Sequence, residues 1–213
     1  MAVGEGRAAR LEDGEVHLWS FDLPADRLIG RKIARERALS IISGYLGLAP
    51  AEVRLELGRR GKPSLTPDER LSFNLSHAGS KGLLAVTSGS RVGVDIEALR
   101  PLLNPIGLAR RFFSPLEADA LAASSDPLAA FFRVWVRKEA YLKGLGKTVP
   151  AYLSRFSVTV EGNPRVISTR LEPGGTRFTL ADIRSPGYAA ALAVEGEIGR
   201  IKNFRLGNTP GGT

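Results

Sequence analysis

The sequence contains no cysteine, which excludes a disulfide framework and a thiolate metal site. Its unbroken apolar stretches are short, for example residues 83–86 and 189–194. None approaches the ~20 residues that a membrane-spanning helix needs. Residues 1–7 lack the apolar core of a secretory signal. These absences predict a cytoplasmic protein with no membrane partner.

The 213-residue chain is basic, with 30 Lys and Arg against 22 Asp and Glu and a net charge of +8. Its 43% hydrophobic and 24% charged residues are typical of a globular protein. A basic protein can bind nucleic acid, an acidic membrane surface, a polyphosphate ligand or an acidic protein. Because the basic residues are dispersed in pairs and no nucleic-acid-binding signature is present, nucleic acid remains a minor alternative.

Hydrophobic periodicity predicts a mixture of strands and helices. A turn at residues 88–90 predicts that the two strands on either side of it form a β-hairpin. Ser114, followed three residues later by Glu117, predicts a helix N-terminus. The expected strands are 15–23, 53–58, 71–75, 82–88, 91–97, 156–161, 165–171, 176–182 and 188–195, and the expected helices are 26–46, 106–113, 115–123 and 126–144.

Two carboxylates in the strand 91–97 point to metal chemistry. Side chains alternate along a strand, so Asp95 and Glu97 share one face while Val94 and Ile96 take the other. Two neighbouring carboxylates repel unless a cation lies between them, and carboxylate oxygens suit Mg²⁺. The alternative is a solvated acidic face, which the residues alone favour.

Glu139 and Lys143 are four residues apart, on one face of the helix 126–144. The pair can be an ordinary surface ion pair, which contributes little to stability. It can also supply a third carboxylate for the metal and a lysine for a metal-bound phosphate. Ser76 and His77, at the end of an expected strand, are either ordinary structural residues or further phosphate ligands.

Four segments in this order resemble the Sfp-type 4'-phosphopantetheinyl transferase family. They are Gly61-Lys-Pro63, Phe73-Asn-Leu-Ser-His77, Gly93-Val-Asp-Ile-Glu97 and Trp135-Val-Arg-Lys-Glu-Ala-Tyr-Leu-Lys143. A fifth, Arg111-Phe-Phe-Ser-Pro-Leu-Glu117, resembles another family motif. The resemblance covers roughly residues 35–160.

The resemblance implies an α+β fold of two similar subdomains related by pseudo-twofold symmetry, with a ligand in the cleft between them. We accordingly predict an N-terminal subdomain at residues 1–100 and a C-terminal subdomain at 101–206. The last residues, 207–213, are expected to form a disordered tail. A monomer is expected.

The resemblance also implies an activity: transfer of the phosphopantetheine arm of coenzyme A onto a serine of an acyl or peptidyl carrier protein, with release of 3',5'-ADP. The pathway could be fatty acid, polyketide or nonribosomal peptide synthesis. The implied catalytic residues are Glu139 and Lys143, and the implied Mg²⁺ ligands are Asp95, Glu97 and Glu139. The implied coenzyme A contacts are Arg35, Lys62, Pro63, Asn74, Ser76, His77 and Lys143.

One departure from the family pattern keeps a second function open. The family usually has a longer basic stretch between the first strand and the first helix, whereas here residues 22–26 lead almost directly into the helix. Arg27, Arg31, Lys32 and Arg35 are the available substitutes for that stretch. A non-catalytic relative that binds coenzyme A or a nucleotide is therefore the alternative.

Overall fold

The computed structural model describes residues 10–57, 63–65, 71–147, 152–169, 171 and 177–207, and has an α+β fold. None of its described helices has the length and apolar character needed to cross a membrane. Its helices are α1 (Arg27–Leu46), α2 (Pro105–Phe112), α3 (Pro115–Ala122) and α4 (Pro127–Gly144), with short 3₁₀ turns at Pro50–Glu52 and Leu153–Arg155. Its strands are β1 (Glu15–Asp22), β2 (Leu55–Leu57), β3 (Pro63–Leu65), β4 (Leu71–Ala78), β5 (Lys81–Ser88), β6 (Val92–Ala98), β7 (Phe156–Val158), β8 (Val166–Thr169), β9 (Phe178–Asp182), β10 (Tyr188–Glu195) and β11 (Arg200–Leu206).

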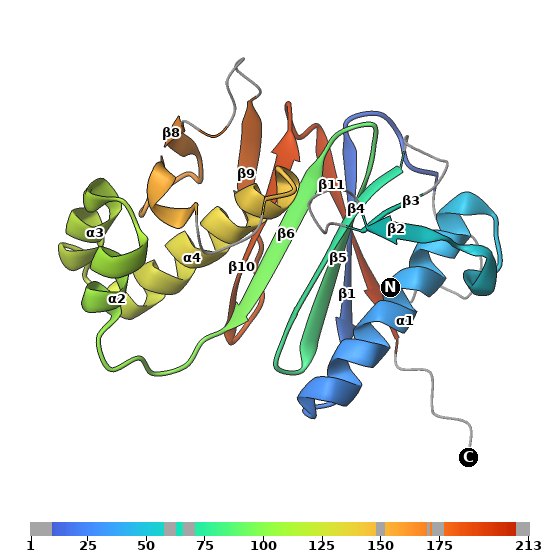
Figure 1. Ribbon diagram of the computed structural model, residues 1–213, viewed down its shortest axis with the longest axis horizontal. Helices are drawn as coiled ribbons and strands as arrows, with labels where there is room; N and C mark the ends of the chain where they lie inside the picture. The colour runs from blue at the N-terminus through green and yellow to red at the C-terminus, as the bar shows by residue number, and fades with distance from the viewer. Residues whose placement is uncertain are drawn as a thin grey trace.

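The first sheet has the strand order β11-β1-β5-β4 and is covered on one face by α1 (Figure 1). Asp26 begins the helix, because its side chain accepts hydrogen bonds from the backbone N–H groups of Leu28 and Ile29. Gly47 ends it in the left-handed region, at φ 68°. The buried core between α1 and this sheet consists mainly of Trp19, Phe21, Ala34, Ala38, Ile42, Phe73, Leu84 and Val86.

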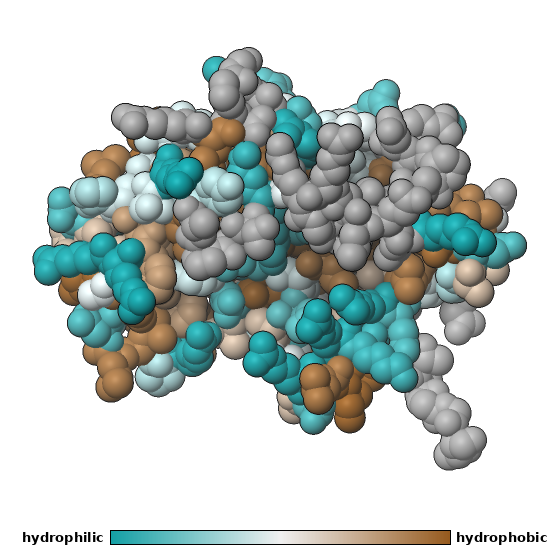
Figure 2. Space-filling view, in the orientation of Figure 1, coloured by the Kyte–Doolittle hydropathy of each residue, from teal (hydrophilic) through white to brown (hydrophobic). Residues whose placement is uncertain are grey.

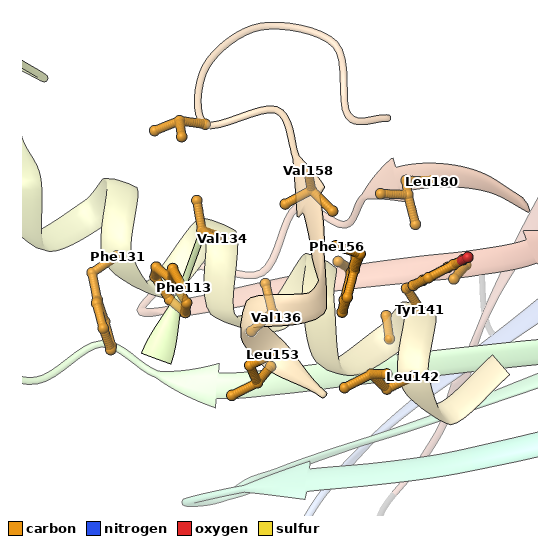
Figure 3. Packing of buried hydrophobic residues seen from close by; sticks show 14 of the residues in the cluster. Phe113, Phe131, Val134, Val136, Tyr141, Leu142, Leu153, Phe156, Val158 and Leu180 are labelled. Atoms are coloured by element: carbon orange, nitrogen blue, oxygen red, sulfur yellow. The ribbon is translucent and has the colours of Figure 1, made fainter. Parts of the chain in front are cut away.

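The second sheet has the order β6-β10-β9 and is covered by α4 (Figure 1). Gly93 permits the close approach of the helix, because a Cβ atom there would lie 2.1 Å from the Ala140 carbonyl oxygen. Figure 3 shows the core on the far side of α4, where Tyr141 packs against Phe156 of β7 with ring centroids 4.9 Å apart. This core fixes α4 between the second sheet and the helices α2 and α3.

A third buried cluster joins the two sheets face to face. Leu18 and Leu83 come from the first sheet, and Val94, Ile96 and Leu192 from the second. Along the long axis of Figure 1 the layers therefore run from α4 through the two sheets to α1.

The hairpin predicted across residues 88–90 is wrong. Among the described strands, β5 pairs with β4 and β1, whereas β6 pairs with β10 in the other sheet. The turn at Gly89 (φ 75°) sends the chain from one sheet into the other, so that the apolar face of β6 closes the core between the sheets. The antiparallel hairpin in this region is β4–β5, whose turn follows Ala78.

Strand β11 was not predicted, and it lies parallel to β1 in the first sheet. The predicted subdomain boundary at residue 100 falls between β6 and α2, and it stays a prediction. Apart from Gly207, the predicted tail lies outside the described residues.

Candidate functional site

A polar cluster lies where β6 faces the C-terminal half of α4 and the edge strand β4. β6 carries Asp95 and Glu97 on its α4-facing side, since the alternate residues Val94 and Ile96 are in the core between the sheets. α4 carries Glu139 and Lys143 one turn apart. The structure thus brings together the residues that the sequence indicated.

Asp95, Lys143 and Ser76 form a closed triangle of hydrogen bonds. Lys143 Nζ lies 2.6 Å from Asp95 Oδ1 and 3.0 Å from Ser76 Oγ. Ser76 Oγ donates to the same Asp95 oxygen over 2.9 Å. The main contacts of Lys143 are therefore with Asp95 and Ser76. The carboxylate oxygen of Glu139 lies farther away, 3.9 Å from the ammonium.

The second oxygen of the Asp95 carboxylate has no partner among the described residues. Asp95 is 2% exposed, and its Oδ2 atom is buried without a hydrogen bond. Burial raises the pKa of Asp95, and Lys143 opposes that rise. An unpaired buried carboxylate oxygen is costly, so it identifies a position where a ligand atom or an ion would be stabilised.

The other two carboxylates share the same low-dielectric environment. Burial, followed by the charge of Asp95, raises the pKa of Glu139 to about 7. Burial and then Asp95 also raise the pKa of Glu97, against the opposing effect of Arg100. The three carboxylates therefore repel one another, and Lys143 alone does not neutralise them.

The donor chemistry fits a divalent cation. In the part of the chain that the structure describes, no three His, Asp or Glu side chains converge closely enough to enclose an ion. The unpartnered Asp95 oxygen and the mutual repulsion of the carboxylates nevertheless favour a hard cation with oxygen ligands. Asp95, Glu97 and Glu139 stay the predicted ligands of such a cation.

A group of cations lies near His77, on the other face of β4. Burial lowers the pKa of His77, and the charges of Arg31, Lys143, Arg27 and Arg35 lower it further. Three of these cations are spaced four residues apart along α1, so they share one helix face. The predicted coenzyme A contact Arg35 is thus one of the charges that lower the pKa of His77.

The remaining predicted residues are not all part of this cluster. Asn74 accepts a hydrogen bond from the backbone N–H of Val94, and so it links β4 to β6. Pro63 begins β3. Lys62 lies outside the described residues.

Sequence reasoning missed a buried ion pair that fixes α4 in place. Lys138 and Glu117 are both fully buried, with Nζ 2.6 Å from either carboxylate oxygen. Glu117 also accepts from the backbone N–H of Val158, and Lys138 donates to the Phe156 carbonyl. Burial lowers the pKa of Lys138 to about 8, although Glu117 opposes this. The only signal in the sequence was a lysine beside Glu139 on a largely apolar helix.

Comparison with known proteins identifies the family. Residues 91–193 match the model of the 4'-phosphopantetheinyl transferase superfamily. The 4'-phosphopantetheinyl transferase HetI of Nostoc is 43% identical over 122 residues, which are 55% of this chain and 50% of HetI. The chain thus spans about half the length of this relative.

Two other relatives match over more of their length. The transferase ffp of Bacillus subtilis is 32% identical over 72% of this chain and 68% of its own. AcpT of Salmonella typhimurium is 36% identical over 62% of this chain and 72% of its own. Among solved structures, the holo-[acyl-carrier-protein] synthase of Neisseria meningitidis aligns with a TM-score of 0.41 and 20% identity over 50% of this chain and 97% of its own. The chain belongs to the 4'-phosphopantetheinyl transferase superfamily.

Proposed function

We propose that the protein is a Mg²⁺-dependent transferase that moves the phosphopantetheine arm of coenzyme A onto a serine of an acyl or peptidyl carrier protein. The observation that carries the proposal is the Asp95 carboxylate, which is held on one side by Lys143 and Ser76 and has an unpartnered buried oxygen on the other. Membership of the superfamily supports the same activity.

The phosphates of coenzyme A complement the cations of this site. Lys143 is 26% exposed at its side chain, so its ammonium can reach a phosphate while it stays near Asp95. The arginines Arg27, Arg31 and Arg35 provide a second cationic group for the remaining phosphate oxygens, and His77 can donate a hydrogen bond from its neutral imidazole. Lys62, Pro63 and Asn74 complete the proposed set of coenzyme A contacts.

The chemical step is an attack by the carrier serine oxygen on the β-phosphorus of coenzyme A. The new bond joins the serine oxygen to phosphorus, the bond from phosphorus to the bridging oxygen breaks, and 3',5'-ADP leaves. Glu139 accepts the serine proton, directly or through a water, and Lys143 stabilises the charge on the leaving side. Bound Mg²⁺ would neutralise charge on the pyrophosphate, held by Asp95, Glu97 and Glu139.

The charge of the protein matches the proposed macromolecular partner. Carrier proteins are typically acidic around the serine that is modified, and this chain has a net charge of +8. Complementary charge accelerates association and favours the correct orientation of the partners. We propose that the enzyme acts as a cytoplasmic monomer.

The experiment is incubation of the protein with coenzyme A, Mg²⁺ and a panel of apo carrier proteins from fatty acid, polyketide and nonribosomal peptide synthesis. Intact mass spectrometry should show one carrier gaining a single phosphopantetheine group. Reactions without Mg²⁺, or with Asp95→Asn, should show no gain. If coenzyme A binds by calorimetry but no carrier is modified, the protein is a non-catalytic binding relative and the proposal fails.

A further inference from the structure

A pocket of about 320 Å³ lies at one end of the space between the two sheets. Its walls come from β1, β5 and β11 of the first sheet and from β6 and the segment 183–186 of the second half of the chain. We call it the end pocket. The apolar core that joins the sheets stops before it reaches this end, and the volume left open is within the range of small-molecule sites.

The inner wall of the end pocket is apolar. Leu18, Leu83 and Ile96 line it and are each less than 5% exposed, and Ile183 adds a partly buried aliphatic side chain. An aliphatic chain placed against these residues would leave water and contact other hydrocarbon groups. Such burial is favourable by about 25 cal/mol for each Å² of apolar surface.

The rim of the end pocket is polar and carries excess positive charge. Three cations, Lys81, Arg184 and Arg205, line it together with one carboxylate, Asp22. Asp22 is engaged by both Lys81 and Arg205, the latter at 2.9 Å. Arg184 has no hydrogen bond or ion pair with any residue in the described part of the chain, and it is exposed. One guanidinium is therefore available at the mouth for an anion.

We propose that the end pocket is a second ligand site, which binds a small amphipathic anion, specifically a monocarboxylate with a short unbranched apolar chain. The carboxylate would pair with Arg184, and the chain would lie against Leu83 and Ile96. Both parts are needed, because an anion alone would bury no hydrocarbon of its own in the pocket and a neutral chain would gain no ion pair with Arg184.

The end pocket is separated from the site described above by one strand. Ile96 lies between Asp95 and Glu97 in the sequence, and its side chain is on the opposite face of β6. Leu83 is in register with Ser76, the residue that holds Asp95. The inference does not rest on the proposed function, because it uses none of the coenzyme A or metal contacts.

The test is calorimetric titration of the full chain, without coenzyme A or metal, with sodium octanoate. Sodium acetate and 1-octanol are the comparison probes, because each supplies only one half of the proposed ligand. We expect saturable one-site binding of octanoate and no saturable binding of the other two at the same concentrations. Absence of saturable octanoate binding in the millimolar range would overturn the proposal.

Three variants locate the binding. Arg184→Gln should weaken octanoate by about tenfold, the usual effect of losing one charge-assisted hydrogen bond. Ser20→Val adds a branched side chain at a lining position and should weaken binding by obstructing the pocket. The matched control is Arg177→Gln, which removes the same charge at an exposed position outside the end pocket and should leave binding unchanged.

Melting temperatures and circular dichroism establish whether the variants are folded. Equal affinity in wild type, Arg184→Gln and Ser20→Val would place octanoate elsewhere and reject the site. Equal weakening by Arg177→Gln would show that only net charge attracts the ligand, and this too would reject it.

Discussion

Asn74 Oδ1 accepts a hydrogen bond from the backbone N–H of Val94 at 2.8 Å, although the strands that carry these two residues belong to different sheets. Val94 directly precedes Asp95, and Ser76 follows Asn74 two residues along on the same face of β4. The contact therefore joins the strands at the place where Ser76 meets Asp95.

We predict that Asn74→Leu destabilises the protein, because the Val94 N–H would lose its partner. The expected loss is about 1–3 kcal/mol in the free energy of unfolding, measured by urea denaturation. Asn74→Asp keeps an oxygen in the same place and should retain more of this stability. If both variants keep wild-type stability and lose only affinity for coenzyme A, Asn74 is a ligand residue and not a link between strands.

A second prediction concerns the metal. Mg²⁺ should raise the melting temperature of the wild-type protein, and Asp95→Asn should abolish this increase, because a neutral amide replaces the carboxylate with the unpartnered oxygen. Turnover should fall about a hundredfold or more, as for other groups that stabilise transition-state charge. Glu195→Gln removes a carboxylate that pairs with Arg91, so it is the matched control and should keep the response to Mg²⁺. A Mg²⁺ response that survives in Asp95→Asn would place the cation elsewhere.

The third prediction is a pH dependence of stability at Glu139. Its pKa in the folded protein is raised from 4.5 to about 7, chiefly by burial, so folding favours the protonated form. Stability from this group is therefore present below pH 4.5 and is lost as the pH rises through 7. Because Gln does not ionise, Glu139→Gln should melt on the order of a few °C higher than wild type at pH 8.

The difference in melting temperature should shrink towards zero as the pH approaches 4.5. Thermal scans in EDTA across this interval measure it, since bound metal would favour the charged form. A variant that melts below wild type at pH 8 would show that Glu139 is stabilised by Lys143 and not strained by its carboxylate neighbours.

The fourth prediction concerns the buried pair Lys138–Glu117. Lys138→Met leaves the Glu117 carboxylate buried without its cation, and should cost about 3–5 kcal/mol of stability. Adding Glu117→Gln removes that charge while an amide oxygen remains for the Val158 N–H. The double variant should recover most of the loss in chemical denaturation. A double variant no more stable than Lys138→Met would mean that the loss arises from packing around Lys138.

The sequence alone predicts correctly those features that depend only on neighbouring residues, such as helix starts and the two faces of a strand. Ser114 marks a helix start through its own side chain, and the structure confirms this cap. The helices predicted to begin near residues 26 and 126 are also present, and there the structure adds Asp26 and Asp126 as caps. The alternation around Asp95 likewise gave the correct face of β6. The pairing of Asp95 with Lys143 could not be predicted from spacing, because it depends on how closely α4 packs against Gly93.

The prediction from sequence failed for the pairing between strands that are distant in the chain. The short turn at residues 88–90 predicts a hairpin from local chemistry, but the apolar face of β6 is buried in the core between the sheets. β11 has only a few partly buried apolar residues, so its alternation is weak and its place beside β1 is set by tertiary contacts. The role of Lys138 was hidden for the same reason, since its partner lies on another helix.

The parallel pairing of β1 with β11 has a consequence for the order of folding. The strand that begins at Glu15 obtains one of its two neighbours only when Arg200–Leu206 is available. A nascent chain that has emerged only as far as β10 leaves that side of β1 as an open sheet edge, which can pair with other chains. The pairing of β1 with β11 also joins residues near the two ends of the sequence, and such non-local contacts form slowly. We therefore expect the first sheet to be completed late in biosynthesis, and β1 to be the segment that most needs protection until then.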